Sequence, residues 1–390
     1  MQKRLLLSSK DKLLQLAVME DGELMELYTE QAGSESLVGN IYLGRIDNVL
    51  PGMHAAFVDI GLDKNGMLSL SDIAVPEAKQ AIEGTNKPLK PGNEIIVQVF
   101  KQPGGEKGVR LTCHISLPGK TMVLMPTVHY IGISKKITDD DERARLRAIA
   151  NELCESKMGL IIRTAAEGMV QEELYQEAQA LIAQWNEISS RAQYAKPPKL
   201  LHENLNLAQR AARDMLLPDV EELIVDDPAV FAQIEQPMVR LHSSEIDLFT
   251  LHRVESQIEK AQQRRVWLDC GGYIVIDKTE AMTVIDVNTG KFVGKNNIDE
   301  TMLKINCEAA VEIAKQLRLR DIGGIIIIDF IDMESSKCAE TLLETFANAL
   351  KRDRSKTNLH GMTKLGLVEM TRKKMGVGSP LNRAPSKEKR

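Results

Sequence analysis

The sequence has few residues of the kinds that mark special environments. Aromatic residues make up only 4% of its 390 residues, and its five cysteines form no C-x-x-C pair. Scattered cysteines without metal-binding spacing are typical of a reducing compartment and give no zinc signature. We therefore expect a cytoplasmic protein without a disulfide framework.

Long hydrophobic runs are also missing. A membrane-spanning helix needs about 18 or more consecutive apolar residues, and no window of the sequence reaches that length. The first residues, MQKRLLLSSKDK, contain three leucines, whereas a secretory signal needs about 7–15 apolar residues. The sequence predicts neither an integral membrane segment nor a signal peptide.

The sequence also lacks an excess of positive charge. Its net charge of −5 argues against a generally basic coat for nucleic acid. Local basic patches can still contact phosphates, and such patches lie at 135–136, 350–356, 371–374 and in the tail SKEKR. Each patch taken alone is equally well read as solvated surface.

What is present indicates several domains of mixed α+β class, since the chain is too long for one simple core. Residues 1–30 predict a meander of short strands. From Val38 to about 115, about five strands separated by glycine-rich turns predict a small closed barrel of OB type, although any five-stranded barrel would give this pattern. The following segment alternates strands and helices, and residues 247–268 predict one helix that leads into a strand.

The most informative region begins at Gly271. GGYIVIDKTEAMTVIDVN predicts a hairpin, 298–320 an amphipathic helix, and IIIIDFID a strand buried on both faces. Strand, helix and strand in this order form a right-handed parallel crossover. Asp286 and Asp329 then end neighbouring parallel strands about 4.8 Å apart at one edge of the sheet.

Two carboxylates this close repel each other unless a cation or a proton lies between them. A hard divalent ion resolves the conflict, and Mg²⁺ is the ion usually held by one or two carboxylates, water and a substrate phosphate. Asn288 points to the same face as Asp286 and could orient its carboxylate. The chemistry suggests metal-assisted hydrolysis of a phosphate ester, although strand-end aspartates are often simple loop acids or helix caps. Asp332 is expected to support the site or to cap the next helix.

Three segments, GGYIVIDKTEAMTVIDVNTGK, KQLRLRDIGGIIIIDFIDM and GLVEMTRKK, give the chain a specific resemblance to the ribonuclease E/G family of bacterial endoribonucleases. The resemblance runs in order over residues 1 to about 375. It implies a ribonuclease-H-like part with an inserted OB-fold RNA-binding barrel, a 5′-end sensor region and a DNase-I-like catalytic domain. The implied parts are a first ribonuclease-H-like segment at 1–35, the barrel at 36–115, the sensor at 116–210, a second ribonuclease-H-like segment at 211–270 and the catalytic domain at 271–375. Separately, the composition of residues 376–390 predicts a basic, disordered tail.

The resemblance also implies roles for individual residues. Its two metal-binding aspartates match Asp286 and Asp329, and its supporting asparagine matches Asn288. The positions of a pocket for a 5′-monophosphate match Gly119, Val123, Arg163 and Thr164. The RNA-contact positions match Phe57, Lys107 and Lys356.

The sequence departs from the family pattern at two places. A second aromatic stacking position is Met67, which stacks on a base less well than a ring does. The family usually continues past EMTRKK to a C-P-x-C pair that shares zinc between protomers, whereas this chain continues MGVGSPLNRAPSKEKR. Mg²⁺ is the expected cofactor, and the zinc link of the family is in doubt because this sequence has no C-x-x-C pair.

The resemblance implies an Mg²⁺-dependent endoribonuclease that cuts single-stranded RNA and leaves 5′-phosphate and 3′-hydroxyl ends. The implied preference is for 5′-monophosphorylated RNA, the implied substrates are mRNA and the precursors of rRNA and tRNA, and a homo-oligomer is expected. Two alternatives stay open at this point: a non-catalytic RNA-binding or ribosome-associated protein of the same fold, and a metal-dependent phosphodiesterase that acts on something other than RNA.

Overall fold

The protein is described by a computed structural model that covers residues 2–31, 36–73, 89–102, 108–154, 158–234, 236–290, 298–333 and 335–374. Lys107 and the predicted tail at 376–390 lie outside these residues. The chain divides into two compact units, Met1–Gly33 with Pro218–Arg390, and Ser34–Leu217. No helix in the described part of the chain is long and apolar enough to cross a membrane.

The first unit contains a sheet built from both ends of the sequence. The predicted meander is confirmed, with β1 (Lys3–Lys10), β2 (Leu13–Glu20) and β3 (Glu23–Gln31) pairing in antiparallel fashion. β14 (Val220–Val225) adds to β1 in parallel, and β15 (Val239–Leu241) adds to β14. The sheet order is therefore β15-β14-β1-β2-β3.

Three short helices accompany this sheet, α5 (Pro228–Phe231), α6 (Leu248–Leu251) and α7 (Val254–Gln262). The prediction of one continuous helix over the α6–α7 region is wrong. Arg253 adopts a left-handed backbone conformation with φ of 55°, which ends the regular helical geometry after α6. β16 (Arg265–Trp267) then follows as the predicted strand.

The second unit contains the predicted barrel. β4 (Ile41–Leu50), β5 (Ala55–Asp59), β6 (Gly66–Ser69), β8 (Arg110–Thr112) and β7 (Glu94–Lys101) follow one another in the sheet. β4 also pairs with β7, so the five strands close on themselves and the predicted closed barrel is confirmed. The short turns η1 (Pro51–Met53) and η2 (Leu70–Ile73) flank β5 and β6, and β13 (Lys199–His202) extends the sheet beside β4. Alternate strand residues such as Val58, Leu68 and Val97 fill the interior.

A second, smaller sheet in the same unit has the order β11-β12-β10-β9. Its strands are β9 (Leu117–Pro118), β10 (Met122–Met125), β11 (Ile131–Ile133) and β12 (Gly159–Ile162). The helices of this part are α2 (Asp140–Leu153), η3 (Thr164–Ala166), α3 (Gln171–Tyr194) and α4 (Leu207–Met215). Asp139 begins α2 by accepting a hydrogen bond from the Glu142 amide, as acids at a helix start predict.

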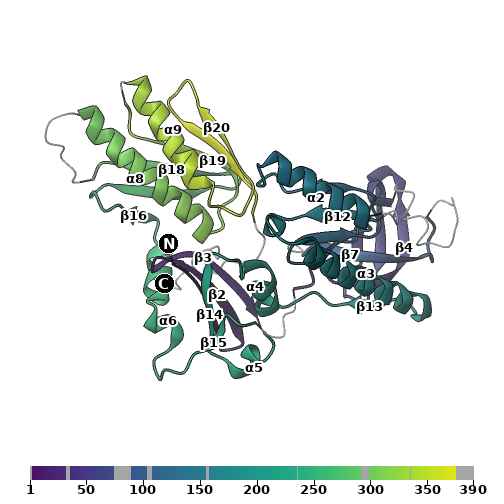
Figure 1. Cartoon of the computed structure of the whole chain (residues 1–390). Helices are drawn as coiled ribbons and strands as arrows, with labels where there is room; N and C mark the ends of the chain where they lie inside the picture. Colours follow the sequence, from purple (N-terminus) through teal and green to yellow (C-terminus); the bar gives the residue numbers. More distant parts are fainter. Residues whose placement is uncertain are drawn as a thin grey trace, which may run out of the picture. The chain divides into compact units, whose positions relative to one another are not determined.

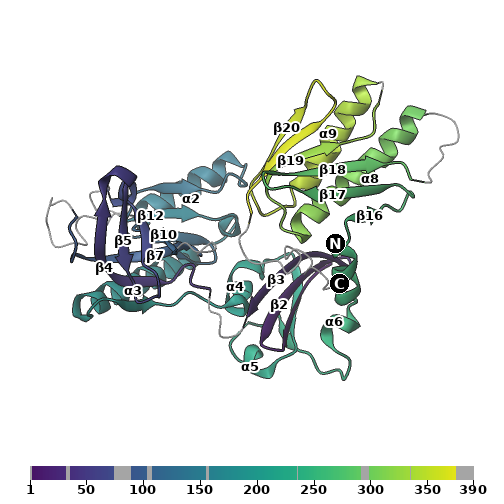
Figure 2. The same cartoon turned by 180° about the vertical axis from the view of Figure 1, so that it is seen from behind.

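The remaining sheet of the first unit has the order β16-β17-β18-β19-β21-β20. Its further strands are β17 (Tyr273–Lys278), β18 (Met282–Asn288), β19 (Gly324–Asp329), β20 (Thr357–Met362) and β21 (Val368–Arg372). The predicted hairpin of β17 and β18 and the predicted parallel crossover are confirmed, since α8 (Ile298–Leu319) connects β18 to a parallel β19. α8 and α9 (Ser336–Leu350) lie on the same face of this sheet (Figures 1 and 2).

The prediction that the isoleucine strand is buried on both faces is wrong. Ile326 and Ile328 are fully buried beneath the helices, but Ile325 on the opposite face is 49% exposed. The reason is that α8 and α9 cover only one face, so alternate residues of β19 point away from the core. We call this second face of the sheet the open face. It carries the carboxylates of Asp286 and Asp329.

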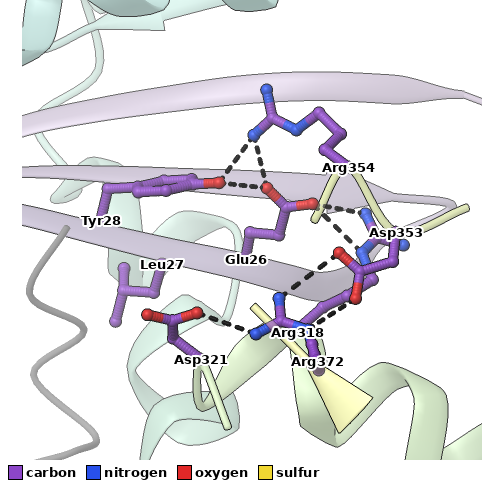
Figure 3. Close-up of a pocket in the computed structure, with 8 residues that line it drawn as sticks. All are labelled: Glu26, Leu27, Tyr28, Arg318, Asp321, Asp353, Arg354 and Arg372. Carbon is purple, nitrogen blue, oxygen red and sulfur yellow. Dashed lines mark hydrogen bonds and ion pairs between the residues drawn. The ribbon is translucent and has the colours of Figure 1, made fainter. Parts of the chain in front are cut away.

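A buried cluster of charges joins the amino-terminal meander to this second sheet within the first unit. Glu26 on β3 accepts hydrogen bonds from Arg318 at the end of α8 and from Arg354, and Arg354 also donates to the Tyr28 hydroxyl (Figure 3). Arg372 on β21 bonds Asp353 and Asp321 in the same region. Buried charges need such partners to offset the loss of water, so the cluster fixes how the two sheets pack.

Candidate functional site

Asp286 and Asp329 lie directly beside each other on the open face. They are paired residues in the parallel ladder of β18 and β19, where neighbouring strands are about 4.8 Å apart. Each follows a buried isoleucine, Ile285 or Ile328, that is held under the helices. Because the backbone of both strands is fixed by this packing, two exposed carboxylates are presented side by side to solvent.

Asn288 supports the first of these carboxylates. Its Nδ2 donates a hydrogen bond of 2.7 Å to Asp286 Oδ2. The two residues are two positions apart on β18, so both point to the open face. The bond holds one oxygen of the Asp286 carboxylate, Oδ2, in a fixed position.

The donor set fits a hard divalent cation. No group of three or more His, Cys, Asp or Glu side chains suited to a metal occurs among the described residues, so a protein cage of that kind is not observed there. Two carboxylates with an adjacent amide match instead the way Mg²⁺ is usually held, because this ion keeps several waters and takes oxygens from the substrate phosphate. Asp286 and Asp329 are the residues that would hold it.

The residues predicted to form a phosphate pocket meet at the end of the smaller sheet of the second unit. Arg163 follows β12, and its Nη1 donates to the carbonyl oxygen of Gly119 at 2.5 Å. Val123 lies on β10, the strand next to β12. Thr164 adjoins Arg163, and its hydroxyl is 2.8 Å from the Ser134 hydroxyl. The structure thus gathers all four predicted positions in one region.

An acidic residue that we did not predict, Asp214, forms an ion pair with the Arg163 guanidinium. Asp214 Oδ1 lies 2.6 Å from Arg163 Nη1, and Arg213 donates to both oxygens of the same carboxylate, at 3.0 and 2.8 Å. Burial alone would raise the pKa of Asp214, but hydrogen bonds from Arg213 and the charge of Arg163 hold this pKa below its ordinary value. Only Nη1 of the Arg163 guanidinium has a protein partner among the described residues, so Nε and Nη2 can bind a ligand.

A second carboxylate, Glu177 on α3, holds the adjacent turn. It accepts hydrogen bonds from the backbone amides of Lys120 and Thr121 and from the Thr121 hydroxyl. Because Gly119 sits tightly against the same carboxylate, an added Cβ there would collide with Glu177 Oε1. Glu177 therefore fixes the turn that carries Gly119.

The barrel presents a row of side chains on its outer surface. Phe57 on β5 pairs with Met67 on β6, and Met67 pairs with Arg110 on β8. The neighbours of Phe57, Ala56 and Val58, are fully buried, so Phe57 points outward and is partly exposed. An aromatic ring, a thioether and an exposed guanidinium are thereby aligned across three strands. Lys107, predicted as a contact on the same barrel, lies outside the described residues.

Lys356 is exposed at the start of the edge strand β20. The basic run around it is not a uniform surface patch, because Arg354 belongs to the buried charge cluster and Asp353 is 4% exposed. The described residues show no hydrogen bond from the Lys356 side chain that would withdraw it from solvent. The ammonium of Lys356 is therefore exposed to solvent.

Comparison with known proteins identifies the class to which this fold and site belong. The model of the Ribonuclease E/G family matches residues 116–375. Ribonuclease G of Haemophilus influenzae is 41% identical over 378 residues, which are 92% of this chain and 77% of that protein. Ribonuclease G of Escherichia coli K12 is 41% identical over 377 residues, with the same coverage. Ribonuclease E of Synechocystis is 39% identical over 390 residues, which are 96% of this chain and 57% of that protein.

The chain belongs to the ribonuclease E/G family. The resemblance on which the sequence interpretation was based is therefore confirmed. As a member of this family, the protein is a hydrolase of the endoribonuclease class.

Several side chains near these sites were not predicted, among them Glu177, Asp214, Arg213 and Arg110. Asp214 and Arg213 lie about fifty positions from Arg163 along the chain, and no motif links them. Arg110 is visible in VRLT only as one basic residue of a strand. Its significance depends on the ladder from β5 through β6 to β8, which sequence patterns do not specify.

Proposed function

We propose that this endoribonuclease depends on Mg²⁺ and hydrolyses single-stranded RNA to 5′-phosphate and 3′-hydroxyl ends. The observation that carries the proposal is the pairing of Asp286 and Asp329 on one ladder with the Asn288 bond at their side. This arrangement is what a divalent ion shared with a substrate phosphate requires.

In this proposal Asp286 and Asp329 hold the ion, and Asn288 orients the Asp286 carboxylate. When bound, the ion supplies positive charge to the phosphate oxygens and makes a nearby water more acidic. The rigid strands beneath the carboxylates keep both ligands in place, since Ile285 and Ile328 are fully buried. The exposure of both carboxylates leaves room for a polymer to lie across the open face.

We further propose that Arg163 and Thr164, with Gly119 and Val123, bind the 5′-monophosphate of the substrate. A guanidinium is a strong partner for phosphate oxygens, and the neighbouring hydroxyl adds a donor. The free Nε and Nη2 of Arg163 support this role. One cleavage would then generate the 5′-phosphate that favours the next.

We propose that the barrel binds single-stranded RNA. Phe57 would stack on a base, Met67 would add a weaker contact, and Arg110 and Lys107 would contact phosphates. In the first unit, Lys356 beside β20 would add a further phosphate contact. Aromatic and basic side chains combined in this way bind single strands without reading sequence.

The wider assignments follow from family membership. We assign residues 1–35 and 211–270 to a ribonuclease-H-like part, 36–115 to an OB-fold barrel, 116–210 to the sensor and 271–375 to a DNase-I-like catalytic domain. The proposed cellular role is mRNA decay and the maturation of rRNA and tRNA precursors by a cytoplasmic homo-oligomer. The relatives named Ribonuclease G and Ribonuclease E support the RNA-processing part of this role.

The reaction is tested by product analysis on three substrates with Mg²⁺: a single-stranded RNA, the same RNA annealed to its complement, and a chromogenic phosphodiester that is not RNA. The proposal predicts cleavage of the single strand alone, with products that a ligase requiring 5′-phosphate and 3′-hydroxyl ends can rejoin. Hydrolysis of the chromogenic ester at a comparable rate would instead favour a general phosphodiesterase. Binding of RNA without cleavage would favour a non-catalytic RNA-binding protein.

A further inference from the structure

The open face carries a second group of side chains, which none of the assignments above uses. Arg265 and Trp267 on β16 and Tyr273 on β17 form a cluster that we call the aromatic triad. The ring centroids of Trp267 and Tyr273 are 5.2 Å apart with an interplanar angle of 59°. The guanidinium carbon of Arg265 lies 4.4 Å from the Tyr273 ring centroid and 5.8 Å from that of Trp267.

The ladder places the aromatic triad on the same face as the carboxylates. Tyr273 pairs with Asn288 on β18, and Trp267 pairs with Tyr273 on β16. Paired residues of antiparallel strands point to the same face, so Trp267, Tyr273, Asn288 and Asp286 all project to the open face. The intervening residues Ile274 and Val287 point the other way and are buried under the helices.

The separation suits a polymer that also contacts the carboxylates. From Asp286 to Trp267 the ladder crosses two strand spacings and advances two residues, which gives about 12 Å between Cα atoms. An RNA whose phosphate lies at Asp286 and Asp329 would thus bring a flanking nucleotide to the triad.

The exposure of Trp267 indicates that it serves binding more than stability. Its side chain is 55% exposed in a protein with only two tryptophans. Arg265 makes no ion pair with a described carboxylate, and its contacts are the two rings. The guanidinium of Arg265 offers a cation for a phosphate, and the exposed ring of Trp267 offers aromatic surface for a base.

We propose that the aromatic triad is a stacking subsite for an unpaired nucleobase of the RNA that occupies the carboxylate site, an inference that rests on the proposed function. A base in a duplex is stacked on its neighbours and is not available to Trp267. The subsite therefore favours single-stranded RNA next to the cut, and Arg265 neutralises the backbone of the nucleotide whose base is stacked.

Intrinsic fluorescence tests the subsite directly. The Trp185→Phe protein has Trp267 as its single tryptophan, and it is titrated with a single-stranded RNA of about 10 nucleotides in the presence of a chelator. The 5′-hydroxyl form of the RNA avoids the phosphate pocket. The proposal predicts that the fluorescence of Trp267 is quenched in proportion to the fraction of protein bound to RNA, which is measured independently from the anisotropy of labelled RNA. The same RNA annealed as a duplex should cause no quenching.

The RNA affinities of variants provide a second test of the subsite. Trp267→Ala is expected to weaken RNA binding about tenfold, whereas Trp267→Phe, which keeps a ring, retains most of the affinity. Tyr194→Ala, which removes an aromatic ring that is 86% exposed in the other unit, is the matched control and is expected to bind RNA like the wild type.

Two results would overturn the subsite. One is unchanged Trp267 emission at saturating RNA together with unchanged affinity of Trp267→Ala. The other is a lower molar mass of Trp267→Ala by light scattering with unchanged RNA affinity, which would assign the triad to contact between copies of the chain. Failure of the proposed function is separate, since it appears as absence of RNA cleavage by the wild type with Mg²⁺ and leaves the fluorescence readings intact.

Discussion

At the scale of single residues, the most specific feature is the hydrogen bond from Asn288 to Asp286. Because it fixes the carboxylate that would share the ion, Asn288→Ala is expected to lower cleavage about 10–100-fold at limiting Mg²⁺. The matching readout is the Mg²⁺ concentration for half-maximal rate, which should rise in the variant, with part of the rate recovered at high Mg²⁺. A loss of rate with an unchanged Mg²⁺ dependence would contradict the positioning role.

The guanidinium of Arg163 gives a second prediction. Arg163→Ala should remove most of the preference for 5′-monophosphate over 5′-hydroxyl RNA, about a tenfold to hundredfold change in the ratio of kcat/KM values, because a charge-assisted bond is lost. Arg191→Ala on α3, whose ion pair with Glu187 is exposed, is the control and should keep the preference. A preference that survives Arg163→Ala would exclude this residue as the sensor.

The substrate phosphate, and not Asp214, is expected to set the pH dependence of that preference. Its pKa is held below the ordinary value, so Asp214 stays charged well into the acid range and keeps its bond to Arg163. The substrate phosphate loses its second negative charge below about pH 6. The preference measured between pH 8 and pH 5 should therefore fall on acidification in the wild type and in Asp214→Asn alike. A decline confined to the protein with Asp214 would show that Asp214 itself titrates.

The sequence predicted some of these residues and missed others for a physical reason. Asp286, Asn288 and Asp329 could be predicted from the sequence, because the ends of two strands in a crossover must share one edge of the sheet. Asp214 could not be predicted from the sequence, since its contact with Arg163 depends on how α4 approaches the end of β12. The helix-cap alternative for Asp332 is wrong, because Ser335 occupies the cap position of α9.

At the scale of elements, β19 shows where hydrophobic pattern stops being informative. Four consecutive isoleucines suggest burial on both faces, yet Ile325 is 49% exposed while Ile326 is buried. The strand was correctly placed because its length and its position after a long helix specify a crossover. Which face of the strand is covered depends on where α8 and α9 pack. The sequence alone does not distinguish an isoleucine on the open face from an isoleucine in the core.

The buried charge cluster gives a stability prediction at this scale. Glu26 is 6% exposed and bonds Arg318 and Arg354, so Glu26→Ala leaves buried charge without its partner and should destabilise the first unit by about 3–5 kcal/mol. Urea unfolding measures the change as a shift in midpoint. Glu221→Ala, which removes an exposed partner of Arg4, is the control and should cost less than about 1 kcal/mol. Equal effects of the two substitutions would contradict a structural role for the cluster.

The same cluster should make stability depend on acid pH. Burial alone would raise the pKa of Glu26, but Arg354 and Arg318 outweigh it and lower this pKa from 4.5 to about 2. A lowered pKa contributes stability that is present above pH 4.5 and is lost as the pH falls toward 2. The difference in unfolding free energy between wild type and Glu26→Ala should therefore shrink over this window, and a constant difference would refute the assignment.

At the scale of the whole molecule, the chain builds its first unit from segments far apart in sequence. β1 pairs with β14, more than two hundred positions later, and the second unit is the chain between them. Local patterns predicted the strands but not this pairing, because strand signals carry no information on distant partners. The closed barrel was predictable, since its strands follow one another closely and need no distant element for closure.

The two units should be separable. Two hydrophobic clusters formed by described residues of the second unit lie wholly within it, one inside the barrel and one beneath α2 and α3. A fragment of residues 34–217 is therefore expected to fold alone and to unfold in a cooperative thermal transition followed by circular dichroism. Absence of a cooperative transition in the fragment would show that its folding needs the rest of the chain.

The central claim is that Asp286 and Asp329 form one metal-dependent site for cutting RNA. It is tested most directly by the rate of cleavage of a 5′-monophosphorylated single-stranded RNA, with Mg²⁺ and with a chelator, by wild type, Asp286→Asn and Asp329→Asn. The account predicts cleavage by the wild type with Mg²⁺ only, and a fall of more than about a hundredfold in each variant, beyond the loss typical of a supporting residue. Cleavage by either variant at the wild-type rate, or wild-type cleavage that persists in the chelator, would contradict it.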